Sequence, residues 1–180
     1  MSSSADFAPN PDHVWIDKGV LYKDNTTASP VRIGVCEGDI EFNVERTFRW
    51  VPYNNQVSTR TKGLGRKQIV DASLKIPTIE LSPNALTYVF AGLQLTDNTT
   101  YYTITESHDI ATSDYWTDAT FLGTTQSGKY VKIVLNNAIG ETNTTQTFKK
   151  DEEVVTELML YACVDSSTPT VIPYSYDLEI

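Results

Sequence analysis

Two segments of the sequence alternate between apolar and polar residues, which is typical of a β-strand with one buried face and one exposed face. In residues 39–50 and 68–78 the apolar positions lie two apart: Ile40, Phe42, Val44, Phe48 and Trp50 in the first segment, and Val70, Ala72, Leu74 and Ile76 in the second. The pattern therefore predicts two long half-buried strands, with Phe42, Val44, Leu74 and Ile76 packed between two sheets.

The intervening positions of both segments form a polar face. Its members are Asp39, Glu41, Asn43 and Glu45 in the first strand, and Asp71, Ser73 and Lys75 in the second. The connection between the strands, from about Pro52 to Lys67, is longer than the two to five residues of an ordinary hairpin loop. The pattern thus predicts a long β-hairpin loop, and loops of this length usually carry a function.

A short helix is predicted after the second strand. Ser82 is suited to the N-cap and Pro83 to the first helical position, where its missing N–H costs nothing. An apolar stripe at helical spacing follows, made of Leu86, Val89, Phe90 and Leu93. Gly92 is placed to end the helix, which should pack on a sheet.

The remainder of the sequence predicts further strands: 14–22 as a strand pair turning at Lys18–Gly19, then 99–105, 119–122, 129–135, 154–164 and 170–177. The segment 154–164 is apolar on both faces, as in a central strand, whereas Pro173 marks the last segment as an edge strand or arm. We therefore expect a mainly β protein: a flexible arm over residues 1–12 and one domain over 13–180, with a two-sheet sandwich or barrel-like fold and one flanking helix.

Several kinds of chemistry find little support. Cys36 and Cys163 are far apart and form no zinc motif, so no metal and no cofactor is expected. Residues 123–129 match GxxxxGK, but Tyr130 replaces the magnesium-binding hydroxyl and a strand follows, which predicts a hairpin turn in place of a nucleotide site. No nucleophile motif accompanies the two histidines, so we expect no enzyme. The sequence also lacks a signal peptide and a membrane-spanning run, which predicts synthesis in the cytoplasm and no membrane partner.

Charge is distributed unevenly along the chain. Arg46 to Lys75 holds seven basic residues and one acid, a net charge of +6 that leaves −15 for the remainder of a chain whose net charge is −9. The basic loop is open to three interpretations: a solvated loop, a grip on nucleic-acid phosphates by residues 60–67, or a contact with the acidic surface of another copy of the chain. Head-to-tail contacts of the last kind generate rings or filaments.

The order of these features resembles the major tail tube proteins of long-tailed, siphovirus-like bacteriophages. The resemblance rests on Ile33-Gly-Val-Cys-Glu-Gly38, the acidic strand through Glu45, Lys62-Gly-Leu-Gly-Arg66, Ile79-Glu-Leu-Ser-Pro-Asn-Ala-Leu86, and the closing segments 154–165 and 172–177. It spans about residues 30 to 180. It implies a virion protein of a two-sheet β-sandwich fold with one helix, forming hexameric rings that stack into a hollow tube for genome ejection.

The resemblance also implies roles for particular residues. The strand faces bearing Asp39, Glu41, Asn43, Glu45, Asp71, Ser73 and Lys75 would line the channel, and the loop bearing Arg60, Lys62, Arg66 and Lys67 would contact a neighbouring ring. Further partners would be a tape-measure protein and the tail terminator and tip proteins, with DNA passing through the lumen without specific binding. An acidic lumen fits that passage, since basic walls would hold phosphates.

Two other functions are compatible with the same sequence. A soluble nucleic-acid-binding β module would use the basic loop 60–67, and a phage adhesin or head-decoration domain would share the β-sandwich. A salt-dependent shift of DNA by the monomer would favour the first of these over a tube.

Overall fold

The computed structural model describes residues 16–37, 40–51, 62, 65–78, 87–125, 128–141 and 156–179. Within them the chain forms mainly strands: β1 (Ile16–Lys23), β2 (Val31–Glu37), β3 (Glu41–Trp50), β4 (Gly65–Thr78), β5 (Leu93–Asp97), β6 (Tyr102–Glu106), β7 (Trp116–Thr125), β8 (Tyr130–Gly140), β9 (Thr156–Tyr161) and β10 (Tyr174–Leu178). A 3₁₀ turn, η2 (Thr112–Asp114), precedes β7. The predicted mainly β fold is confirmed.

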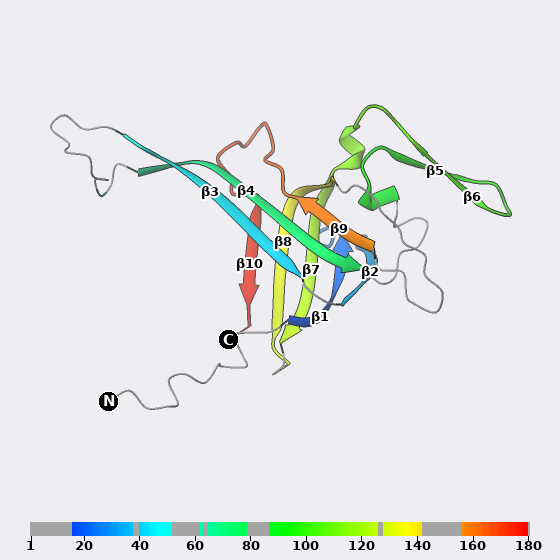
Figure 1. Cartoon of the computed structure of the whole chain (residues 1–180), viewed down its shortest axis with the longest axis horizontal. Helices are drawn as coiled ribbons and strands as arrows, with labels where there is room; N and C mark the ends of the chain where they lie inside the picture. Colours follow the sequence, from blue (N-terminus) through cyan, green and yellow to red (C-terminus); the bar gives the residue numbers. More distant parts are fainter. Residues whose placement is uncertain are drawn as a thin grey trace.

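Eight strands belong to one folded-over sheet in the order β10-β8-β7-β1-β2-β4-β3, with β9 pairing to both β4 and β8. The sheet therefore forms two layers, with β3, β4 and β9 crossing over β10, β8, β7, β1 and β2 (Figure 1). The layers join through Cys36 opposite Thr78 on one side and through Gly140 opposite Leu160 on the other. Strands β5 and β6 form a separate two-stranded sheet.

The core lies between these layers. Leu74 and Ile76 of β4 are fully buried, as the alternation predicts, whereas Phe42 and Val44 of β3 are only partly buried against the core. The Phe42 ring packs edge-on to Tyr174 at 5.6 Å and stacks on Tyr176 at 6.0 Å between ring centroids. Phe42 thus contacts β10, at the margin of the core, because β3 is the end strand of its layer.

Several strand predictions need correction. Residues 16–23 are one strand and not a strand pair, because Gly19 lies within the β1–β7 ladder opposite Gly123. A side chain at Gly19 would meet the Phe121 ring at 2.2 Å, so this glycine makes room for a core residue instead of a turn. Strands β7 and β8 are longer than predicted, and β5 begins at Leu93, which the helical stripe had included.

The helical prediction is only partly covered by the described residues. Residues 87–89 are helical, while Ser82, Pro83 and Leu86 lie outside the described residues. Val89 and Phe90 are buried, as predicted. Gly92 has a φ of +80°, a conformation that favours glycine, and it lies in the turn between the helix and β5, where the Leu93 N–H donates to the Phe90 carbonyl at 3.3 Å.

Two further expectations from the sequence are confirmed. Strand β10 follows Pro173 and lies at the end of the strand order, as an edge strand should. Strands β7 and β8 pair as an antiparallel hairpin up to Thr124 opposite Tyr130, with Gly128 at a φ of +85° between them. The GxxxxGK segment is therefore a β-hairpin connection, without the helix that a phosphate-binding loop requires.

The loop after β1 is held by a buried carboxylate. Asp118 is 1% exposed and accepts hydrogen bonds from the backbone of Asn25 at 3.1 Å and of Thr26 at 2.9 Å, and from the Thr120 hydroxyl at 2.6 Å. The Thr26 hydroxyl also donates to it. Burial by itself would raise the pKa of Asp118, but these hydrogen bonds outweigh burial and hold the pKa below its ordinary value of 3.8.

Replacing Asp118 by Asn should lower the free energy of unfolding at neutral pH by about 1 to 3 kcal/mol, because an amide can accept on only one of its two sides. A lowered pKa in the folded state stabilises the protein above the unfolded pKa, and this stabilisation is lost as pH falls through the folded value. Urea unfolding at pH 7 and at pH 3 should therefore show a smaller difference between variant and parent at pH 3. An equal difference at both pH values would contradict the role assigned to this carboxylate.

Candidate functional site

Three neighbouring strands, β3, β4 and β9, present one polar face. Residues directly opposite each other in a ladder share a face. Across the three strands Glu41 lies opposite Lys75, and Lys75 opposite Met159. In the same way Asn43 lies opposite Ser73, and Ser73 opposite Tyr161, while Glu45 lies opposite Asp71.

Acidic side chains outnumber basic ones on this face. The described acids are Glu41, Glu45, Asp71, Glu157 and, next to the end of β8, Glu141. Lys75 is the basic side chain among them, and its Nζ lies 3.1 Å from Glu157 Oε1 and 3.9 Å from Glu41 Oε1. Because Lys75 is shared between two carboxylates, the face keeps a net negative charge.

A shallow hollow of about 470 Å³ lies on the polar face. It is lined by Asn43, Glu45, Asp71, Ala72, Ser73, Glu141, Met159, Tyr161, Ala162 and Cys163. Burial and, to a smaller degree, the Glu141 carboxylate raise the pKa of the Cys163 thiol, so it stays protonated at neutral pH. The polar groups that line the hollow are the carboxylates of Glu45, Asp71 and Glu141, the amide of Asn43, and the hydroxyls of Ser73 and Tyr161.

The structure places most of the predicted channel residues on this face. Glu41, Asn43, Glu45 and Asp71 are exposed, and Lys75 is half-buried between its two acidic partners. Ser73 is 9% exposed and forms part of the lining of the hollow. Asp39 lies outside the described residues.

Sequence reasoning did not assign Glu157 and Glu141 to this face. Glu157 interrupts an otherwise apolar segment, and this was the available signal that β9 turns one polar residue outward. Nothing in the sequence places Glu141 there, since it reaches the hollow only because β8 ends beside β9.

The outer part of the β3–β4 pair projects beyond the two-layer core, and we call residues 46–51 and 65–70 the arm (Figure 1). Its basic side chains are exposed at Arg46, Arg49, Arg66 and Lys67, and Lys62 is also exposed in the connection between the strands. Arg49 lies directly opposite Arg66. Arg60 lies outside the described residues.

The arm also carries exposed apolar side chains. Phe48 is 50% exposed and Trp50 37% exposed, although both continue the apolar alternation that is buried farther along β3. The Trp50 ring lies over Gly65 on the opposite strand, where a side chain would meet it at 3.1 Å. The alternation therefore continues onto a part of β3 where Arg46 still reaches β10, its Nη2 donating to the Tyr174 hydroxyl at 2.7 Å, while Phe48 and Trp50 are exposed.

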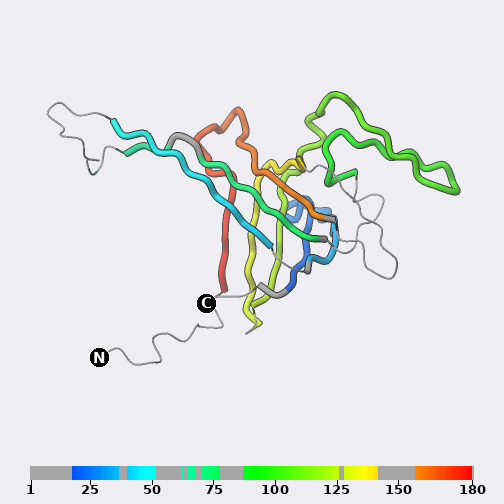
Figure 2. Tube along the Cα trace, in the orientation of Figure 1, coloured from blue at the N-terminus to red at the C-terminus, as the bar shows by residue number. Residues whose placement is uncertain are grey.

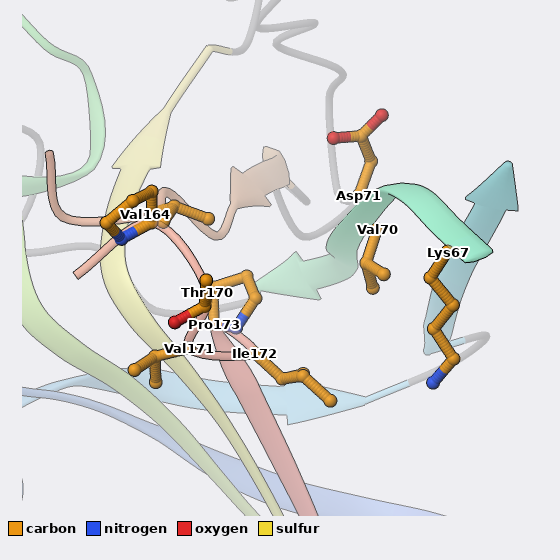
Figure 3. Close-up of a pocket in the computed structure, with 9 residues that line it drawn as sticks. Lys67, Val70, Asp71, Val164, Thr170, Val171, Ile172 and Pro173 are labelled. Carbon is orange, nitrogen blue, oxygen red and sulfur yellow. The ribbon is translucent and has the colours of Figure 1, made fainter.

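A hollow of about 520 Å³ lies between the arm and the segment that leads into β10. Val70 and Lys67 point to the side of this segment, whereas Asp71 points away from it (Figure 3). Ile172 lies on the opposite wall and is 46% exposed. The arm thus has an apolar side turned toward the C-terminal segment and a polar side turned away.

No group of three His, Cys, Asp or Glu side chains that could hold a metal ion occurs among the described residues. In the part of the chain that the structure describes, no helix is long and apolar enough to span a membrane.

No protein-family model matches the sequence, and no curated protein is significantly similar to it. Two solved structures are similar to this chain. One comes from the cryo-EM structure of the anti-feeding prophage baseplate, with 11% identity and a TM-score of 0.42 over 87% of this chain and 93% of that chain. The other comes from the cryo-EM structure of an extracellular contractile injection system, the PVC sheath-tube complex in its extended state, with 13% identity and a TM-score of 0.43 over 99% and 100% of the chains.

Proposed function

We propose that this chain is a structural, non-catalytic subunit of a phage tail tube, assembling as hexameric rings that stack around a channel for genome passage. The observation that carries the proposal is the division of one strand pair into two parts. Near the core, β3 and β4 present an acidic face, while their outer ends form a projecting basic and apolar arm. The sequence resemblance assigns these two parts to the channel and to the contact between rings.

The acidic face is suited to a channel wall. DNA carries a dense negative charge, and a protein binds it non-specifically by neutralising phosphates with Lys and Arg. Near the core, the described side chains of this face offer phosphates one lysine, Lys75, which is already within 4 Å of two carboxylates, and the Arg49–Arg66 pair lies farther out on the arm. Such a wall repels the backbone and leaves DNA hydrated. Tape-measure, terminator and tip proteins would be the other partners, and the assembled tail would be the location of the protein.

The arm is suited to contacts between subunits. A two-stranded ribbon outside a core is marginally stable by itself, and exposed aromatic residues on it favour burial against another protein surface. The basic charge of the arm complements the acidic remainder of the chain, which favours another copy as the partner. A nucleic-acid-binding module remains the second candidate function, because exposed Arg66 and Lys67 lie near Phe48 and Trp50 as at sites that bind single strands.

Concentrated purified protein should form rings or tubes in negative-stain electron microscopy, and assembly should weaken as salt is raised. Reversing charge in the connection and arm with Arg60→Glu and Arg66→Glu should reduce long assemblies in sedimentation while the circular dichroism spectrum stays unchanged. Each exposed pair contributes only about 0 to 1 kcal/mol, but the contact repeats around every ring.

A matched control places the same charge change on the other layer, with Lys18→Glu and Lys132→Glu, and should assemble normally. Assembly of the arm variant equal to that of the parent would contradict a role for the arm. A monomer that forms no assembly and shifts DNA in a salt-dependent way would favour the nucleic-acid-binding function instead.

A further inference from the structure

Two hairpins extend from opposite ends of the molecule. The arm lies at one end, and the β5–β6 hairpin lies at the other (Figures 1 and 2). Beyond Leu93, which packs against the core, the β5–β6 hairpin is largely exposed. Because they are so far apart, the two hairpins of one chain do not meet, and any contact between them joins two copies.

One face of the arm combines apolar and basic side chains. Phe48 lies opposite Lys67, and Arg46 lies opposite Val70, so these four side chains share a face with Trp50. The register shift between Thr47 and Phe48 leaves Gln68 without a partner in the ladder, which is why Lys67 and Val70 point to the same side (Figure 3). This arm face therefore carries two aromatic side chains, with Lys67 across the ribbon from Phe48. Arg46 lies on the core side of them, where its Nη2 donates to the Tyr174 hydroxyl at 2.7 Å.

One face of the β5–β6 hairpin has the opposite charge around a similar centre. Leu95 lies opposite Ile104, Asp97 opposite Tyr102, and Leu93 opposite Glu106. Tyr102 is 51% exposed and Ile104 is 40% exposed. The other face carries Gln94, Thr96, Thr103 and Thr105. The segment 87–115 contains Asp97, Glu106, Asp109 and Asp114 and no Lys or Arg, so this segment itself carries only acidic charges.

We propose that the arm face of one copy packs on the Leu95–Ile104 face of the β5–β6 hairpin of a second copy. This inference rests on the proposed function and names the surface that receives the arm. Apolar side chains meet at the centre of the contact, and Lys67 meets the acidic rim formed by Asp97 and Glu106, while Arg46 keeps its hydrogen bond to Tyr174 of its own chain. The two patches are different surfaces at opposite ends, so the contact is head-to-tail and propagates from copy to copy.

A second copy is chosen as the partner because the two hairpins are complementary in charge and both expose apolar side chains. The charged side chains of the arm, residues 46–51 and 65–70, are all basic. Those of the β5–β6 hairpin, residues 93–106, are all acidic. Each hairpin also exposes large apolar residues that solvent does not favour. Contacts of this composition have an apolar centre and a charged rim, as in interfaces between proteins.

The test reverses charge and removes apolar area on the receiving face alone. Ile104→Ser with Glu106→Lys should raise the concentration needed for assembly about tenfold or more, measured by sedimentation velocity, as expected for truncation of a central apolar contact. The matched control, Gln94→Ser with Thr105→Lys, changes the opposite face of the same hairpin and should assemble as the parent does. Circular dichroism and thermal unfolding should show both variants folded.

Rescue provides the decisive measurement. Lys67→Glu should weaken assembly in the parent background, as should Glu106→Lys, whereas the chain carrying both should assemble better than either. If the parent protein and the Ile104→Ser, Glu106→Lys variant assemble equally well, this inference is overturned and the proposed function stands. Parent protein that never assembles would overturn the proposed function itself. If the Gln94→Ser, Thr105→Lys control loses assembly as much as the Ile104→Ser, Glu106→Lys variant does, the β5–β6 hairpin makes a different contact and the inference is also overturned.

Discussion

Replacing Phe121 by Ala should lower the free energy of unfolding by about 3 to 5 kcal/mol, the usual loss for a buried phenylalanine. Phe121 is fully buried at the centre of β7, between β1 and β8, and its ring fills the space that Gly19 leaves open. The loss should appear as a fall in the thermal midpoint of about 10 °C for a chain of this size.

Phe48 provides the matched control because it is the same residue type, 50% exposed on the arm. Phe48→Ala should change monomer stability by less than about 1 kcal/mol. Phe42→Ala should fall between the two, since its ring is partly buried against Tyr174 and Tyr176. Equal thermal shifts for Phe121→Ala and Phe48→Ala, measured by calorimetry on dilute monomer, would contradict this placement of the core.

If the polar face lines the channel of a tube, as proposed, reversing its charge should slow genome passage. Glu41→Lys with Glu45→Lys replaces two negative charges by two positive ones, a net change of +4 per subunit or about +24 per ring of the proposed hexamer, which is enough to hold phosphates in a salt-dependent way. Both side chains are exposed on the polar face, so the core is untouched and tubes should still assemble. Phage carrying the change should eject genomes slowly or incompletely at low salt and recover at high salt.

The control for this experiment is the isosteric pair Glu41→Gln with Glu45→Gln, which removes charge without adding basic groups. It should eject genomes much closer to the parental rate than the lysine variant does. Normal ejection kinetics from fully assembled lysine-variant tails would mean that this face does not line the channel. The experiment separates a lumen from an outer surface, because acids that only solubilise the protein would not influence DNA passage.

The sequence alone predicted the features that depend on local pattern. Period-2 alternation placed Leu74 and Ile76 inside and Glu41 and Asp71 outside, because successive side chains of a strand point to opposite faces. Pro173 marked an edge because it cannot donate to a ladder, and β10 is an edge strand. These outcomes follow from the backbone geometry of a strand and need no knowledge of its neighbours.

Only the tertiary structure decided which elements cover which face. Phe42 and Phe48 belong to the same alternation, yet the Phe42 ring packs beside Tyr174 and Tyr176 of β10 while Phe48 is 50% exposed on the arm. Likewise Asp118 is of a residue type usually found on the surface, yet it is buried. The loop that covers it includes Thr26, which is 92 positions away in the sequence.

The sequence pattern also does not reveal where distant segments of the chain approach each other closely. A side chain at Gly140 would lie 1.6 Å from the backbone oxygen of Val89, so this position requires glycine because the end of the helix packs on the end of β8. The polar face acquires Glu157 and Glu141 for a related reason, since β9 bridges β4 and β8. Alternation specifies the direction of a side chain, whereas long-range strand pairing determines what that side chain meets.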